Sequence, residues 1–261
     1  MVRQTNELNC LHSIELSIGA IVSVALERPI VWKNGYPTAD GRPFAEGDVH
    51  RQAMMLLIKA LEDWYEEDKK VYVSGNLLLY YEEGNKRKRV APDVFVVKGV
   101  KKHMRPNYLL WEEGRAPNIA IEVTSSSMRK EDTVTKFALY QDVLKIPEYF
   151  LFDPFGDYLN PRLQGYRRVD GKYKPIRIRN GQVRSRQLGL ILRTEDKYLR
   201  LVDPGTGKRI PTCEEAIRKS QQARIRIQAD TARIQADTAR IRAEIAALRK
   251  QSLGRNDTLA N

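Results

Sequence analysis

The sequence predicts an α+β domain built on a mixed β-sheet, with a long helix after it. Short apolar segments rich in strand-forming residues are bounded by turn residues between residues 71 and 154. Two hairpin turns, "DG" at 170–171 and "NG" at 180–181, lie in a region of further strands. A repeat of seven residues follows Pro211. The 261 residues of the chain are enough for one sizeable domain plus an extension.

The first 35 residues form an N-terminal extension. Apolar residues alternate over residues 14–26, which is typical of a strand, and this segment is too short to span a membrane. Turn residues dominate residues 35–47. A helix should follow to about residue 67 with Asp48 as its N-cap, because apolar residues recur there at helical spacing.

The rest of the domain, which we place at residues 36–205, reads mainly as strands. A helix from about residue 129 to 143 interrupts them, and residues 162–203 read as antiparallel strands joined by the two hairpin turns. The earlier strands are expected at 71–81, at "APDVFVV" (91–97), at "NIAIEVT" (118–124) and at "EYFLFDP" (148–154).

Residues 206–261 form a C-terminal helical tail. "IQADTAR" occurs at 227–233 and again at 234–240. A seven-residue period favours a left-handed coiled coil and hence a homo-oligomer, with a dimer as the expected form. The second seam position is weak, however, so a solvated single helix is the alternative. The main seam consists of Ile227, Ile234, Ile241 and Leu248, and the second of Thr231, Thr238 and Ile245.

The charge balance points to an anionic partner. Lys and Arg number 45 against 33 Asp and Glu, which gives a net charge of +12. Nucleic acid is the commonest partner of a strongly positive protein. The alternatives are that the charge keeps the protein soluble or that it attracts an acidic protein. The basic stretch Lys86, Arg87, Lys88 and Arg89 precedes the strand at 91–97 and suits contacts to DNA phosphates, although a solvated hairpin tip would look the same.

The expected compartment is the cytoplasm, without membrane attachment. No segment is long and apolar enough to be read as a membrane span. The two cysteines, Cys10 and Cys213, lie far apart and in no metal-ligand spacing, which argues against a disulfide framework and against a cysteine-based zinc site. A reducing cytoplasm is the default for such a chain.

Two carboxylates interrupt neighbouring apolar strands. Glu122 shares a strand face with Ala120 and Thr124, a face that does not have to be the core, and Asp93 stands at the head of the preceding strand. Each alone could be an ordinary edge or turn carboxylate. Together they could hold Mg²⁺ or Mn²⁺, which prefer oxygen ligands. Phosphodiester hydrolysis uses such an ion, and a nearby lysine would orient the attacking water.

"APDV", followed 29 residues after its Asp by the Glu of "EVTSSS", then a helix with Asp, Lys and Tyr, then "EYFLFDP", resembles the PD-(D/E)XK nuclease superfamily. Within it, the chain is similar to the bacterial Uma group of putative restriction endonucleases from about Tyr36 to residue 212. This resemblance implies a restriction-endonuclease-like mixed sheet with flanking helices and Mg²⁺-dependent cleavage of DNA. It assigns Asp93 and Glu122 as catalytic metal ligands.

The lysine that the superfamily pattern places two residues after the glutamate is Thr124 here. The Uma group commonly lacks that lysine too, and Lys136 is the best replacement. A helical wheel puts Lys136 on one face with Asp132 and Tyr140, which are auxiliary candidates. Asp132 could orient Lys136 at the spacing of a helical ion pair, or Lys136 could simply snorkel from a packed helix.

Glu46 and His50, near the start of the first helix, are further candidates for a metal or water contact. His50 could equally be a structural or capping residue. The function that the sequence predicts is therefore Mg²⁺-dependent endonucleolytic cleavage of DNA. Two alternatives remain: a nuclease-fold module that binds DNA or a partner without cutting, and a self-associating scaffold in which the tail is the working part.

Overall fold

The structure is a computed structural model that describes residues 34–38 and 47–257, with side chains up to residue 247. The expected strand at 14–26 and the candidate Glu46 lie outside these residues. The described residues divide into two compact units between Thr212 and Cys213. Within them, no helix combines the length and the apolar character that crossing a membrane requires.

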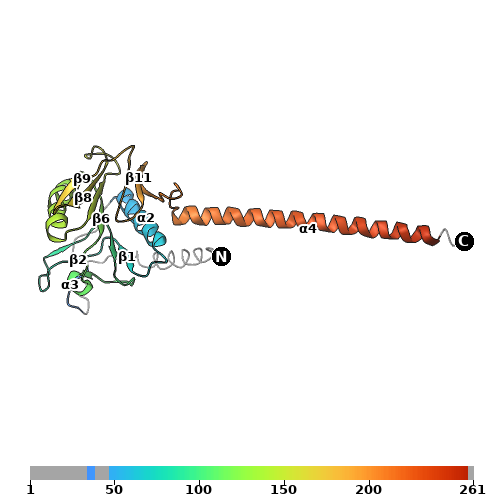
Figure 1. The fold of residues 1–261 in the computed structure, drawn as a ribbon, viewed down its shortest axis with the longest axis horizontal. Helices are drawn as coiled ribbons and strands as arrows, with labels where there is room; N and C mark the ends of the chain where they lie inside the picture. Colours follow the sequence, from blue (N-terminus) through green and yellow to red (C-terminus); the bar gives the residue numbers. More distant parts are fainter. Residues whose placement is uncertain (1–33, 39–46, 258–261) are drawn as a thin grey trace. The chain divides into compact units, whose positions relative to one another are not determined.

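The first unit is an α+β domain with a mixed sheet, as the sequence predicts (Figure 1). Its largest sheet has six strands in the order β1-β4-β6-β7-β8-β9. β6 and β7 pair in parallel, and the other neighbours in this sheet are antiparallel. The strands are β1 (Val71–Ser74), β4 (Val94–Lys98), β6 (Ile119–Val123), β7 (Glu148–Phe152), β8 (Leu163–Val169) and β9 (Lys172–Pro175).

The described residues of this unit also form two three-stranded sheets, the helix α2 and three short helical segments. One sheet has the order β10-β11-β12 and the other the order β3-β2-β5. Their strands are β10 (Gln182–Arg184), β11 (Ile191–Glu195), β12 (Tyr198–Val202), β3 (Arg89–Val90), β2 (Leu79–Tyr80) and β5 (Tyr108–Leu109). The helices are α2 (Asp48–Trp64), α3 (Leu110–Glu113) and the π-helical segments η1 (Glu131–Lys136) and η2 (Leu139–Val143).

The predicted strand at 71–81 is two strands in different sheets, so that expectation is wrong. β1 ends at Ser74 and β2 begins at Leu79. Gly75 approaches the backbone so closely that an added Cβ would lie 2.0 Å from the carbonyl oxygen of Asp93. Asn76 follows with φ of 48°, a left-handed conformation that ends a strand. The chain turns here, immediately beside the predicted site.

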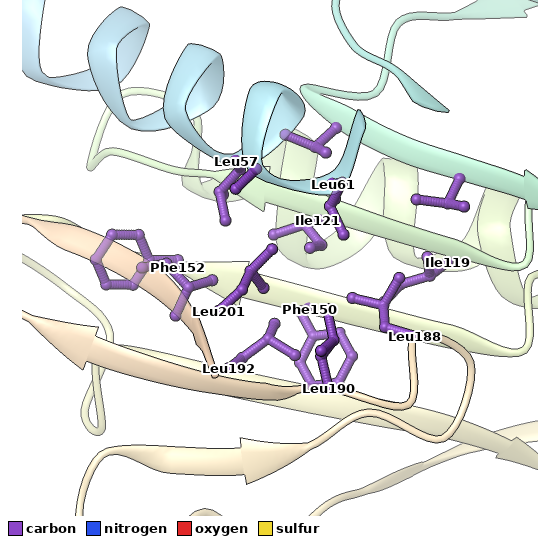
Figure 2. Packing of buried hydrophobic residues seen from close by; sticks show 14 of the residues in the cluster. Leu57, Leu61, Ile119, Ile121, Phe150, Phe152, Leu188, Leu190, Leu192 and Leu201 are labelled. Atoms are coloured by element: carbon purple, nitrogen blue, oxygen red, sulfur yellow. The ribbon is translucent and has the colours of Figure 1, made fainter. Parts of the chain in front are cut away.

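Helix α2 covers one face of the main sheet (Figures 1 and 2). It begins at Asp48 with Gly47 as its N-cap, so the predicted cap lies one residue too late. Its apolar stripe meets side chains of β6, β7 and the β10–β12 sheet in the larger hydrophobic core. Figure 2 shows Leu57, Leu61, Ile119, Ile121, Phe150, Phe152, Leu188, Leu190, Leu192 and Leu201 packed there.

A second hydrophobic core lies on the opposite face, because alternate residues of β4 and β6 point there. Phe95 and Ala120 contribute from the sheet, and Tyr140 and Leu144 come from the helical segment. The face of β6 that holds Glu122 is therefore covered. The alternation of side chains along the strand did not require this, since it allowed that face to be open to solvent. The opposite side of this helical segment is not buried, since Val134 and Val143 are exposed there.

The two predicted hairpin turns are confirmed. Asp170 and Gly171 join β8 to β9 with φ of 52° and 82°, and Asn180 and Gly181 turn with φ of 50° and 67°. Both central residues of a type I′ turn need positive φ, which Asn, Asp and Gly tolerate best. The strands from β8 to β12 pair antiparallel, as expected for residues 162–203.

The second unit contains the long C-terminal helix α4 (Cys213–Asp257), which confirms the predicted helical tail (Figure 1). Its alanines and straight-chain residues favour helix, and neither Gly nor Pro interrupts residues 214–253. The predicted seam residues 227, 234 and 241 lie on this one continuous helix, and the side chain of Leu248 lies outside the described ones.

Deleting residues from 215 onward should leave the α+β domain folded. The three hydrophobic clusters among the described residues contain nothing beyond Ile210, so truncation removes no core side chain. Thermal unfolding followed by circular dichroism should keep its cooperative transition within a few degrees of the full chain. Loss of the transition on truncation would show that α4 supports the domain directly.

Candidate active site

The two predicted carboxylates meet at the end of one strand pair. In the β4–β6 register Val94 pairs with Ile121, so the next pair outward is Asp93 opposite Glu122. The backbone N–H of Asp93 donates to Glu122 Oε2 over 3.2 Å. The backbone N–H of Val123 donates to Asp93 Oδ2 over 2.8 Å. These bonds lock the two carboxylates to each other's strand.

Glu122 is buried completely and is held by two donors from the helical segment. Lys136 Nζ donates to Glu122 Oε2 over 2.8 Å, and the Tyr140 hydroxyl donates to Oε1 over 2.7 Å. Both donors project from the side of the helical segment that covers β6. The helix that the sequence predicted to supply a lysine therefore does bring Lys136 to Glu122. Since Lys136 is itself only 6% exposed, it does not snorkel into solvent.

A second set of contacts holds Lys136 from the other side. Asp132 Oδ1 lies 3.2 Å from Lys136 Nζ, one helical turn earlier. Thr124 Oγ1 donates to Asp132 Oδ2 over 2.5 Å and lies 2.5 Å from the Tyr158 hydroxyl. Because the Thr124 hydroxyl has one hydrogen, which goes to the carboxylate, Tyr158 is the donor to Thr124. Thr124 thus stands at the position where the superfamily pattern expects a lysine. It supports Asp132, which faces the replacement lysine, Lys136.

His50 also reaches the carboxylate pair. His50 lies in the first turn of α2, and its Nε2 is 3.5 Å from Asp93 Oδ2. The sequence could only mark its segment as a candidate, and the structure brings it to the site. The other candidate of that segment, Glu46, lies outside the described residues.

The cluster contains more buried acidic groups than basic ones. Asp93, Glu122 and Asp132 are 8%, 0% and 2% exposed, and Lys136 provides one ammonium against these three carboxylates. Burial raises the pKa of Glu122 to about 8, and the charge of Lys136 only partly offsets this effect. Burial likewise raises the pKa of Asp132. Burial alone would lower the pKa of Lys136, but Glu122 and the two aspartates outweigh it and raise that pKa.

Surplus buried carboxylate charge is the condition that a cation relieves. Among the described residues, no set of three or more His, Cys, Asp or Glu side chains is arranged to hold a metal ion. An ion at this site would therefore rest on Asp93 and Glu122 and keep several waters, which fits Mg²⁺ better than a metal that demands a full protein cage. Asp93 and Glu122 supply the oxygen ligands that a hard divalent cation would use here.

The site opens into a pocket of about 790 Å³ that also receives the basic stretch. Asp93 and Lys136 line one part of this pocket, and Arg87, Lys88 and Arg89 line another. Lys86, the fourth residue of the stretch, lies 6.0 Å from the ring centre of Tyr36 instead. Two of the three predicted catalytic residues and three of the four predicted phosphate-contacting residues therefore line one cavity, although they come from different elements, while Glu122 is buried behind it.

The sequence reasoning missed the supporting roles of Thr124 and Tyr158. Thr124 occupies the position where the superfamily pattern has a lysine. It lies on the same strand face as Glu122, and this was the sequence signal that it belongs to the site. Tyr158 lies in the loop after β7, and nothing in the local pattern marks it. Its contact depends on how that loop folds back.

The domain is a mixed-sheet α+β fold in which two carboxylates are paired at the end of one strand pair. Residues 33–195 match the Uma2 family, described as "putative restriction endonuclease", and the chain belongs to this family. The crystal structure of a putative nuclease from Anabaena variabilis ATCC 29413 is similar, with a TM-score of 0.42 and 12% identity over 58% of this chain and 81% of that one. No curated protein matches the sequence.

The metal-free protein should lose stability as the pH rises toward 8. The pKa of Glu122 is raised, so its protonation stabilises the fold fully below the ordinary glutamate value of about 4.3, and this contribution disappears as the pH passes through about 8. A divalent cation that replaces the proton should stabilise most at high pH. We expect millimolar Mg²⁺ to raise the melting temperature by on the order of 5 °C at pH 8.5 and by less at pH 6.

Differential scanning fluorimetry over pH 5–9, with and without Mg²⁺, measures both slopes. Glu122→Gln is the control, because it keeps the size of the side chain and removes the titrating proton. The variant should show a flatter pH dependence and a smaller Mg²⁺ shift. A Mg²⁺ shift that is equal at pH 6 and 8.5 would contradict the link between this proton and the metal.

Proposed function

We propose that the protein is an endonuclease that hydrolyses DNA phosphodiester bonds with Mg²⁺ or Mn²⁺. The observation that supports this function best is the shared pocket: Asp93 and Lys136 line one part of it, and Arg87, Lys88 and Arg89 line another. Glu122 lies buried behind them and accepts a hydrogen bond from Lys136. A phosphate backbone that contacts these basic side chains can thus reach Asp93 and Lys136. Family membership and the net charge of +12 agree with this proposal.

Each residue has a distinct task under this proposal. Asp93 and Glu122 hold the divalent cation, which would lower the pKa of an attacking water and stabilise charge on the phosphoryl oxygens. Lys136 orients that water and offsets the negative charge of the transition state. Asp132 and Tyr140 are positioning residues, because the first faces the ammonium of Lys136 and the second donates to Glu122. His50 is a candidate for holding Asp93.

The basic stretch at residues 86–89 positions the substrate. Arginine and lysine contacts to phosphates supply affinity that depends on salt and not on sequence. The proposal therefore concerns DNA cleavage and includes no recognition sequence.

Relaxation of a supercoiled plasmid tests this proposal directly. The purified full chain should nick or linearise the plasmid with Mg²⁺ or Mn²⁺, and should stop when EDTA removes the metal. Glu122→Gln, prepared in parallel, measures contaminating nuclease. Equal cleavage by the variant and the wild type would show that this site is not the nuclease active site.

Complete burial of Glu122 favours a second candidate function. A glutamate that is fully enclosed by Lys136 and Tyr140 is also what a structural ion pair looks like. In that case the domain would bind DNA through residues 86–89 without cutting it. Salt-dependent DNA binding with no cleavage by any divalent metal would make this module the better description.

A further inference from the structure

Helix α4 presents an exposed apolar seam. Ile227, Ile234 and Ile241 are 64%, 65% and 51% exposed, and they lie seven residues apart. Steps of seven residues return to nearly the same side of a helix, so these isoleucines form one stripe. Within the described residues, no side chain covers it. A stripe with this period is the geometry by which helices pair as left-handed coiled coils.

The second seam position is suited to burial despite its threonines. The Thr231 hydroxyl donates to the carbonyl oxygen of Ile227 over 2.8 Å, and the Thr238 hydroxyl donates to that of Ile234 over 2.7 Å. Both hydroxyls are thus satisfied within their own helix and leave their methyl groups to face a partner. Burying these threonines leaves no unpaired donor, which is the usual cost of a polar residue in a seam. Ile245 occupies the next equivalent position.

The charges beside the seam indicate which partner and which orientation fit. One side is acidic, and the other is neutral to basic. In a parallel pair of identical helices, each acidic side faces the opposite side of the other copy five residues later, so Asp237 would face Arg242 of the second copy. In an antiparallel pair, acidic sides would face each other. The acidic side consists of Asp230, Asp237 and Glu244, and the opposite side of Gln228, Gln235 and Arg242.

We propose that α4 binds the α4 helix of a second copy of this chain as a parallel, in-register, two-stranded coiled coil. The proposal does not depend on the nuclease function. If the domains bind DNA as proposed above, joining two of them in this way raises the effective local concentration of the second domain on the same DNA molecule.

The mass of the full chain in solution tests the pairing. Sedimentation equilibrium at about 1–50 µM should give the mass of two chains. Ile234→Asn should raise the dissociation constant at least about tenfold, because it puts a polar group into the seam of both copies. Ile225→Asn is the matched control, since Ile225 is equally exposed at 65% and lies about 200° around the helix from Ile227. A monomeric wild type, or equal effects of the two substitutions, would overturn the proposal.

The orientation needs a separate measurement. Energy transfer between a donor and an acceptor at the C-terminus of separate chains should be efficient in a parallel pair. The 45-residue helix is about 68 Å long, so antiparallel pairing along it would hold the two ends far apart and give little transfer. A dimeric mass with little transfer would reject the parallel arrangement. Asp237→Arg should weaken the dimer, and adding Arg242→Asp should restore it.

Discussion

Asp93→Asn is expected to reduce Mg²⁺-dependent DNA cleavage at least about 1,000-fold while DNA affinity changes little. Asparagine keeps the shape and the acceptor oxygen that receives the N–H of Val123. It removes an anionic ligand for the cation, and only two carboxylates are proposed to hold that ion. Affinity should survive because a carboxylate repels phosphate and contributes nothing to binding it.

The companion experiment neutralises residues 86–89 to glutamine. DNA affinity should fall by a similar factor for every sequence, and its salt dependence should flatten, because each lost phosphate contact releases about one counterion fewer. A matched control changes four exposed basic residues that do not line the pocket, and this variant should keep most of the affinity. Those control residues are Lys172, Lys174, Arg177 and Arg179.

The two sets of variants should affect different observables. Electrophoretic mobility shifts at several salt concentrations report binding, and plasmid cleavage at saturating protein reports chemistry. Cleavage by Asp93→Asn at the wild-type rate would show that the metal lies elsewhere. Equal loss of affinity in the 86–89 variant and its control would show that net charge, not this surface, holds the DNA.

The carboxylate pair could be predicted because it depends on local periodicity. Residues two apart on a strand share a face, so Glu122 had to leave the side of Ile121, and Asp93 preceded the neighbouring strand. The same reasoning placed Lys136 and Asp132 together, since residues four apart on a helix are neighbours. Local patterns could not show that a second core covers Glu122. That burial follows from tertiary packing of the helical segment on β6 and β4.

Features that depend on close approach between distant segments escaped prediction. At the break after β1, Gly75 lies against the backbone of Asp93, a contact that the apolar run at 71–81 does not reveal. The contact of His50 with Asp93 and that of Tyr158 with Thr124 also join separate elements. Such contacts arise only when the chain is folded, and they make up much of the surroundings of the candidate site.

Lys136→Gln is expected to reduce cleavage about 100-fold or more without reducing affinity for the metal. Glutamine can still donate a hydrogen bond, but it supplies no charge to orient a water or to stabilise the transition state. Removing the ammonium beside Glu122 and Asp132 also removes a positive charge that opposes a cation, so affinity for Mn²⁺ should stay equal or rise.

Single-turnover cleavage and calorimetric Mn²⁺ titration separate these two effects. Lys59→Gln is the matched control, because Lys59 also forms an ion pair with a residue four positions away, Asp63, at 2.9 Å on a helix outside the pocket. If Lys136 served only as a structural ion pair, its loss would lower the melting temperature, and the remaining folded protein would cleave at nearly the wild-type rate. If the variant loses cleavage but keeps its metal affinity and its fold, the ammonium acts in the reaction. A purely structural ion pair does not predict a loss of cleavage in a protein that stays folded and binds the metal.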